Sequence, residues 1–258
     1  MLFETAAVAF AMFSALPVPQ VQWNQRNMRY ALCAFPLVGG VIGGLWWGWS
    51  ALCAALGLPP LLRAAGLCLL PAAVSGGIHL DGYADTSDAL ASHAGPERKQ
   101  EILKDPRCGA FAVIRLLGYF TGYLGLCGAV RLEEGRWLGC AALSFVLSRT
   151  LSGFAIAAFP LAKNTGLAHT FATAAHRTRV RWILGTAACA LGGGLCLLGG
   201  AAGLAMAAAA AGVLWRYART ARRDFGGISG DLAGWFLQNA EFWMLAALVL
   251  CQYGEAVL

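Results

Sequence analysis

Residues 31–56, ALCAFPLVGGVIGGLWWGWSALCAAL, decide the fold class because the whole stretch contains no charged side chain. A helix of about 20 apolar residues crosses the roughly 30 Å hydrocarbon core of a bilayer, so this stretch is long enough to span it. Gly and Pro separate it from further apolar runs, as at Gly57 and at Gly199 and Gly200. We expect about seven transmembrane helices, at residues 31–56, 61–80, 108–130, 137–161, 182–198, 200–215 and 232–251.

The composition of the 258-residue chain also indicates a membrane protein. It is 59% hydrophobic and only 12% charged, whereas roughly 25% charged residues are usual in soluble domains. Backbone that crosses lipid must satisfy its hydrogen bonds within helices or a closed barrel, and no stretch alternates with period two. The sequence therefore predicts an all-α, polytopic integral membrane protein, with residues 1–258 in one domain. Residues 2–16 are expected to form an N-terminal interfacial or re-entrant helix.

Basic residues are distributed unevenly between the predicted loops. Fourteen of the 19 Lys and Arg residues lie in alternate loops, near residues 20–30, 81–107, 162–181 and 216–231. The loops on the opposite side hold only Arg63, Arg131 and Arg136. Because cytoplasmic loops are enriched in Lys and Arg, we predict a multi-pass protein of the cytoplasmic (inner) membrane with the basic loops inside. The net charge of +6 then reflects topology, so the expected partner is the lipid bilayer and not nucleic acid.

The acidic residues are densest in the stretch 76–88, GGIHLDGYADTSD. Asp81, Asp85 and Asp88 are spaced i, i+4, i+7, so on a helix they share one face. Three neighbouring carboxylates repel each other unless a cation lies among them, and oxygen ligands suit Mg²⁺ or Mn²⁺. An acidic helix start or a solvated face would give the same spacing. The spacing therefore leaves a metal site and a structural role open.

A second candidate stretch is 224–231, DFGGISGD. Gly226 and Gly227 would let the backbone approach a phosphate group closely, and Asp231 would add a metal ligand or orient an attacking group. A loop that only turns the chain is the alternative. Lys104 and Arg107 follow the first acidic stretch. Acidic and basic residues on one membrane face are what a metal-bound diphosphate requires.

Two further residues are candidates for substrate binding. Arg149 lies inside the predicted span 137–161, and a charge within the membrane is expensive unless it faces a partner or a polar cavity. His79 lies two residues before Asp81. A histidine satisfied within the core is the alternative for His79.

At this point the sequence resembles a known family. Residues 77–88, GIHLDGYADTSD, are similar to the G-x-H-L-D-G-x-A-D-T-x-D signature of cobalamin (5′-phosphate) synthase, the adenosylcobinamide-GDP ribazoletransferase family. The family more usually has Ser at Pro106, Thr at Ala110 and Ser229, and Gly at Ala89, and none of these departures removes a carboxylate. Supporting motifs follow in order: LPVP at 16–19, FPLVG at 35–39, KDPRCG at 104–109, Ser148 and Arg149, GGISGD at 226–231, and Glu241.

The resemblance implies a transferase acting late in cobalamin synthesis. A ribose hydroxyl of α-ribazole or its 5′-phosphate would attack adenosylcobinamide-GDP, and GMP would leave. It implies that Asp81, Asp85 and Asp88 hold Mg²⁺ on the diphosphate, with Asp231 as a further ligand or as the proton acceptor. Basic side chains would bind the phosphate oxygens, namely Lys104, Arg107 and Arg149. Further expected partners are a second copy of the chain and other enzymes of the cobalamin pathway.

Two other functions remain as alternatives. A CDP-alcohol phosphatidyltransferase also uses clustered aspartates on a metal, but its D-G-x(2)-A-R pattern would place Arg where Asp85 follows Ala84. In a transporter, the charges inside the spans would line a path. Metal-dependent release of a nucleotide distinguishes an enzyme from a transporter.

Overall fold

A computed structural model describes residues 2–132, 134–162 and 166–255, and every regular element in these ranges is a helix. The all-α prediction is therefore confirmed. Lys163, one of the basic residues counted above, lies outside the described residues. The elements are α1 (Leu2–Phe13), α2 (Gln25–Met28), α3 (Ala31–Leu56), α4 (Pro60–Ser75), α5 (Ile78–Ala91), α6 (Pro96–Ile102), α7 (Ala110–Ala129), α8 (Gly135–Ala158), α9 (Leu167–Ala174), α10 (Arg177–Phe225) and α11 (Gly230–Glu255).

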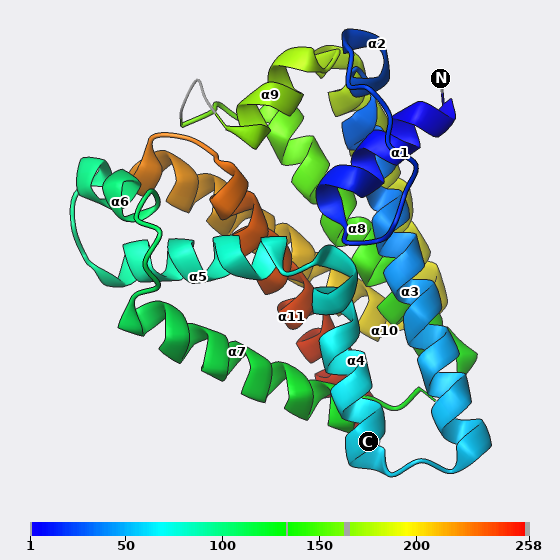
Figure 1. The fold of residues 1–258 in the computed structure, drawn as a ribbon. Helices are drawn as coiled ribbons and strands as arrows, with labels where there is room; N and C mark the ends of the chain where they lie inside the picture. Colours follow the sequence, from blue (N-terminus) through cyan, green and yellow to red (C-terminus); the bar gives the residue numbers. More distant parts are fainter. Residues whose placement is uncertain (1, 133, 163–165, 256–258) are drawn as a thin grey trace.

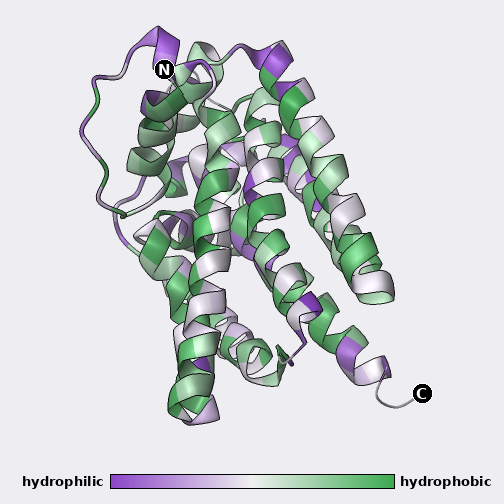
Figure 2. Ribbon diagram, turned by 90° about the vertical axis from the view of Figure 1, so that its right-hand side faces the viewer, coloured by the Kyte–Doolittle hydropathy of each residue, from purple (hydrophilic) through white to green (hydrophobic). Residues whose placement is uncertain are grey.

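Five helices of the described residues are long and apolar enough to cross a membrane: α3, α7, α8, α10 and α11. The pair α4 and α5 adds a sixth if it is counted as one broken span. In Figure 2 the long helices are hydrophobic to neutral along most of their length, and hydrophilic residues gather toward the end of the bundle that carries the N-terminus. A multi-pass membrane protein is thus supported, while the count of seven stays a prediction.

The expected span at 61–80 is interrupted. Helix α4 ends at Ser75, and Gly76 and Gly77 adopt positive φ angles of 63° and 80°, a conformation that glycine reaches without steric cost. The chain turns by 94° at this point, and α5 runs across the bundle (Figure 1). Because α5 carries three aspartates and turns away from α4, we place it outside the membrane-spanning segments.

Helix α10 folds back on itself at Gly200, whose φ of 56° and ψ of −127° are not helical. A straight helix of its 49 residues would be about 74 Å long. Instead, both ends of α10 lie against the same short segment, residues 157–160. Arg177 Nε donates to the Ala157 carbonyl at 3.2 Å, and the Ile228 backbone N, just past the other end, donates to Pro160 at 2.9 Å. The break that the sequence predicted at this position is confirmed (Figure 1).

The N-terminal segment forms α1, a helix of 12 residues that is too short to cross a bilayer. It packs beside α3, and the residues that follow it contact α4. The ring centroids of Phe13 and Phe35 lie 4.2 Å apart, and the Ala15 backbone N donates to the Val74 carbonyl at 2.8 Å. A separate helix before Pro17, as expected from the sequence, is therefore present.

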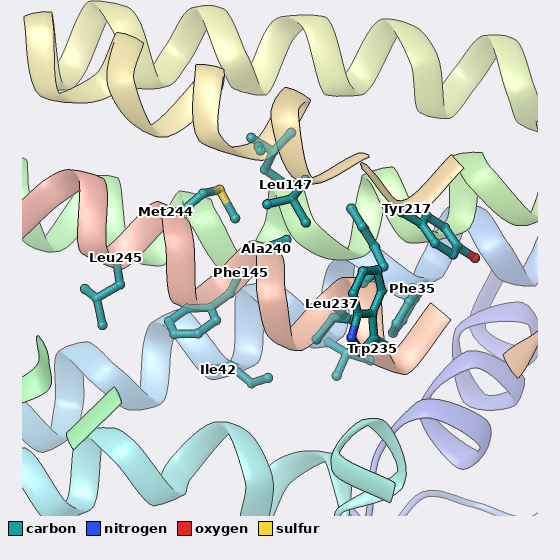
Figure 3. Close-up of a cluster of buried hydrophobic side chains, with 14 of the residues drawn as sticks. Phe35, Ile42, Phe145, Leu147, Tyr217, Trp235, Leu237, Ala240, Met244 and Leu245 are labelled. Atoms are coloured by element: carbon teal, nitrogen blue, oxygen red, sulfur yellow. The ribbon is translucent and has the colours of Figure 1, made fainter. Parts of the chain in front are cut away.

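The hydrophobic core lies between α3, α8, α10 and α11. Figure 3 shows side chains of these helices meeting, among them Phe35, Phe145, Tyr217 and Met244. All four are nearly or fully buried. This packing holds α11 in the centre of the bundle, and the first turn of α11 carries Asp231.

Candidate functional site

The three aspartates of the first acidic stretch lie on one helix, as the spacing predicted. Asp81, Asp85 and Asp88 all belong to α5, Ile78–Ala91. Asp81 is exposed, and the other two are half-buried. Their spacing brings the three carboxylates to one face of α5.

The fourth aspartate, Asp231, reaches this group from α11. Helices α5 and α11 approach closely because each has a glycine at the contact. A Cβ added at Gly82 would lie 2.8 Å from the Asp231 Cα, and one added at Gly234 would lie 2.8 Å from the His79 carbonyl oxygen. Any larger side chain at these positions would separate the two helices. Gly82 therefore allows Asp231 to lie beside the acidic face of α5.

The electrostatics of Asp85 show that the four carboxylates interact. Partial burial, followed by the negative charges of Asp81, Asp231 and Asp88, raises the pKa of Asp85 from 3.8 to about 6. Asp81 and Asp85 form no ion pair with any described basic side chain. The negative charge that these two carboxylates carry near pH 7 favours binding of a cation.

Asp88 has a second contact that the sequence did not predict. Its Oδ1 accepts a hydrogen bond from the Ala112 backbone N at 3.3 Å. Ala112 lies in the first turn of α7, which has four unsatisfied N–H groups and favours negative charge. Asp88 thus holds the start of α7, and with it the preceding loop, next to the acidic face of α5.

A cavity of about 480 Å³ lies over this face. Its walls come from α5, from the loop before α7 and from α7 itself. Asp81, Asp85 and Arg107 all line it, so the structure brings these predicted residues together. Its other lining residues are Gly77, Leu80, Ala84, Asp105, Pro106, Cys108 and Leu116.

Arg107 is held at the cavity by Asp105. Its Nε and one Nη donate to the two carboxylate oxygens of Asp105 at 2.9 and 2.7 Å. This bidentate pair lowers the pKa of Asp105 to about 2, mainly through the hydrogen bonds from Arg107. The Arg107 side chain remains 87% exposed. Arg107 can therefore exchange Asp105 for a phosphate group, which it would bind with the same geometry.

The other predicted residues do not line the cavity. Asp88 and Asp231 act on Asp85 through their charge, whereas the remaining ones lie elsewhere, namely Lys104, Gly226, Gly227, Arg149 and His79. Lys104 is exposed in the same loop but does not line it. Gly226 ends α10 in a left-handed conformation, and the backbone N–H groups of Gly226 and Gly227 both donate to the Ala221 carbonyl. These amides are not free for a phosphate. The interpretation of this loop as a chain turn therefore accounts for both glycines.

Arg149 lies deep between α8 and α11. Its Nη1 is 2.6 Å from Glu241 Oε1, and the two side chains are 1% and 0% exposed. The same Nη1 also donates to the Phe145 carbonyl at 3.0 Å and to Ser148 Oγ at 3.3 Å. Arg149 is thus occupied by a buried ion pair and does not face the cavity.

His79 lies beside this pair and not at the cavity. It is 8% exposed and its Nε2 has no hydrogen-bond partner among the described residues. Burial and then the positive charge of Arg149 lower its pKa to about 3, so the imidazole is neutral. His79 therefore belongs to the packing of α5 against α11, and its ring centroid lies 5.7 Å from that of Phe35 in α3.

Sequence reasoning missed one pair that fixes the loop over the site. Lys99 Nζ lies 2.6 Å from Asp224 Oδ1, and Gln100 donates to the Phe225 carbonyl at 2.8 Å. Together they tie α6 to the end of α10. The sequence signal for this pair was the position of Asp224 at the start of the stretch 224–231.

The donor set is acidic and contains oxygen ligands only. Within the described ranges, no three His, Cys, Asp or Glu side chains converge closely enough to enclose a metal ion by themselves. Mg²⁺ does not require such a cage, because it commonly binds one or two carboxylates together with substrate phosphates and water. The residues at the cavity therefore fit Mg²⁺ carried with a diphosphate better than a resident metal held by protein alone.

Comparisons with known proteins identify the family of this chain. Residues 5–249 match the family described as cobalamin-5-phosphate synthase. A protein of Lachnoclostridium phytofermentans named adenosylcobinamide-GDP ribazoletransferase is 40% identical over 95% of this chain and 93% of its own length. One of Geobacillus kaustophilus with the same name is 32% identical over 94% and 96%, respectively. No solved structure matches. The chain therefore belongs to the cobalamin-5-phosphate synthase family.

Proposed function

We propose that this chain is a membrane transferase that joins adenosylcobinamide-GDP to α-ribazole or α-ribazole 5′-phosphate and releases GMP. The observation that carries the proposal is the cavity at which Asp81, Asp85 and Arg107 meet, with Asp231 close by. Relatives named for this reaction match the chain almost from end to end. A CDP-alcohol phosphotransferase and a transporter are not favoured by these matches.

The reaction requires positioning and charge neutralisation. A ribose hydroxyl oxygen of the acceptor forms a bond to the phosphorus on the cobinamide side of the diphosphate, and the bond from that phosphorus to the GMP oxygen breaks. The hydroxyl proton passes to a base, for which Asp231 is the candidate. Arg107 would neutralise phosphate oxygens once it leaves Asp105. Such alignment and charge stabilisation supply most of the catalysis in phosphoryl transfer.

Mg²⁺ is the cofactor that we propose for this site. Asp81 and Asp85 would hold it at the cavity, with Asp88 and Asp231 adding negative charge or a further ligand. When bound, the ion would neutralise the diphosphate and the developing charge on the leaving GMP. The proposal is supported by the position of Asp81 and Asp85 at the cavity and by the raised pKa of Asp85, which burial and the neighbouring carboxylates cause.

The position in the cell is proposed from the charge distribution. We propose a multi-pass protein of the cytoplasmic membrane with the cavity facing the cytoplasm. The loops rich in Lys and Arg support this orientation, and Asp81 and Arg107 lie in or next to one of them. Assembly into a homo-oligomer and docking of other cobalamin-pathway enzymes stay predictions.

The titration of Asp85 leads to a prediction about stability. Its pKa is about 6 in the folded protein against an ordinary 3.8, so the folded state binds the proton more tightly. The resulting stabilisation is complete below about pH 3.8 and is lost as the pH rises through about 6. We therefore compare the melting temperatures of the wild-type protein and Asp85→Asn in detergent with EDTA. The melting temperature of the wild type minus that of the variant should decrease as the pH rises from about 5 to about 7.

Millimolar Mg²⁺ should recover this loss near pH 7 and have little effect near pH 5, where the proton occupies the site. Glu97→Gln, which removes an exposed carboxylate from the start of α6, serves as the control and should follow the wild type. Equal slopes for the wild type and Asp85→Asn would contradict the raised pKa.

An assay of the purified protein tests the proposed reaction directly. With adenosylcobinamide-GDP, Mg²⁺ and α-ribazole or its phosphate, the protein in liposomes should release GMP and form the corresponding cobalamin. Neither product should appear without the acceptor, since the attacking hydroxyl belongs to it. Release of CMP from a CDP-alcohol, with adenosylcobinamide-GDP left intact, would show that the phosphatidyltransferase alternative is correct.

A further inference from the structure

The second half of α10 exposes one continuous stripe of residues. Leu204, Ala208, Ala211, Trp215, Arg219 and Arg222 are all exposed, and successive members are three or four positions apart. This spacing keeps them on a single face of the helix. Leu204 and Trp215 are 62% and 65% exposed. The stripe therefore runs along the outside of the bundle, from apolar residues through Trp215 to arginine.

The arginine end of the stripe opens into a second cavity, separate from the one over α5. Its volume is about 490 Å³, and it is lined by Trp215, Ala218, Arg219, Arg222 and Arg223. None of these residues lines the cavity over α5. A basic cavity with one aromatic wall is thus present on the outer surface of α10.

The three arginines of this cavity have no acidic partner. Within the described residues, Arg219, Arg222 and Arg223 form no ion pair and no hydrogen bond through their side chains. Asp224 is next to them in sequence, but its carboxylate is engaged by Lys99 at 2.6 Å. The guanidinium of Arg219 lies 5.8 Å from the centre of the Trp215 ring. Three unneutralised guanidinium groups therefore converge on one cavity, which suits a phosphate group.

The order of residues along the stripe indicates where that phosphate comes from. Tryptophan is enriched where the hydrocarbon of a membrane meets the headgroups. On one side of Trp215 the exposed residues are apolar, as lipid acyl chains require. On the other side Arg219 and Arg222 lie about 6 and 10 Å further along the helix axis, at the depth of headgroups. A free nucleotide would not need the apolar half of the stripe.

We propose that Arg219, Arg222 and Arg223, together with Trp215, bind the phosphate headgroup of an anionic phospholipid whose acyl chains lie along Leu204, Ala208 and Ala211. The bound lipid neutralises the cytoplasmic end of α10. That end continues through Asp224, which Lys99 ties to α6, toward Asp231 in α11.

Binding of defined lipids to the purified protein tests this site. Native mass spectrometry should show that the wild-type protein retains phosphatidylglycerol in preference to phosphatidylcholine. The double variant Arg219→Gln, Arg222→Gln should bind phosphatidylglycerol about tenfold more weakly or worse. A matched control is Arg179→Gln, Arg181→Gln, which removes two exposed arginines from the first turns of the same helix. The control should lose less than about twofold.

Three results would overturn the proposal. Equal loss in the two double variants would show that only general surface charge attracts the lipid. Equal retention of phosphatidylglycerol and phosphatidylcholine by the wild-type protein would show that no anionic site exists, and this measurement does not depend on whether a variant folds. Displacement of the lipid by GMP at low concentration would identify the cavity as a nucleotide site. Because the readout is lipid binding, it is independent of the proposed reaction.

Discussion

Replacing Asp85 with asparagine should lower kcat/KM for GMP release by at least about 100-fold. The change keeps the size of the side chain but removes the carboxylate at the centre of the acidic cluster, to which three other aspartates are coupled. In the mechanism proposed above, the Mg²⁺ on the diphosphate then loses a ligand. Release of GMP by the purified variant, measured at several Mg²⁺ concentrations, gives the size of the effect.

The same substitution should not destabilise the protein. Ionised Asp85 is disfavoured in the fold by burial and by its acidic neighbours, so an uncharged asparagine relieves repulsion. We therefore expect loss of activity together with an unchanged or higher melting temperature in EDTA. Glu97→Gln should keep near wild-type activity, because it removes one exposed charge outside the cavity. A variant that retained activity in the presence of EDTA would rule out the metal role of Asp85.

The second large effect is expected at the buried pair Arg149 and Glu241. Replacing Arg149 with methionine alone leaves Glu241, which is 0% exposed, as an uncompensated buried charge. Such a loss typically costs about 3–5 kcal/mol, a large fraction of the stability of most domains. The single variant should therefore give little folded protein, as measured by size-exclusion chromatography and thermal melting in detergent.

Replacing both partners with methionine provides the control. Substituting well-packed apolar side chains for a whole buried ion pair is often neutral, so Arg149→Met, Glu241→Met should recover most of the folded yield. Because Arg149 does not face the cavity, the double variant should also keep most of its activity. A double variant that folds but releases no GMP would show that Arg149 acts on the substrate after all.

The fold class and the acidic face follow from local sequence. Apolar runs long enough to cross a bilayer can only be helices, because no other local structure satisfies their backbone in lipid. The spacing of Asp81, Asp85 and Asp88 places them on one face as soon as residues 78–91 form a helix. The sequence also predicted breaks at Gly57 and Gly200, because glycine adopts positive φ angles without a steric penalty.

The bend after α4 was not predicted from the sequence. The apolar run at 61–80 suggested one straight span, yet two consecutive left-handed glycines turn the chain by 94° before it is complete. Hydropathy depends on composition and carries no information about the direction in which a helix runs. The sequence therefore predicted that this segment is helical but not that its second part crosses the bundle.

What the sequence determined by itself is a helical membrane protein with an acidic helix face and a family signature over that face. What only the tertiary structure decided is which distant residues join it. Asp231 reaches Asp85 because Gly82 lets α11 approach α5. Arg149 forms its ion pair with Glu241, which is 92 positions away in the sequence. Spacing along a helix fixes neighbours within about two turns, whereas contacts between helices depend on how whole surfaces pack, and no local pattern specifies that packing.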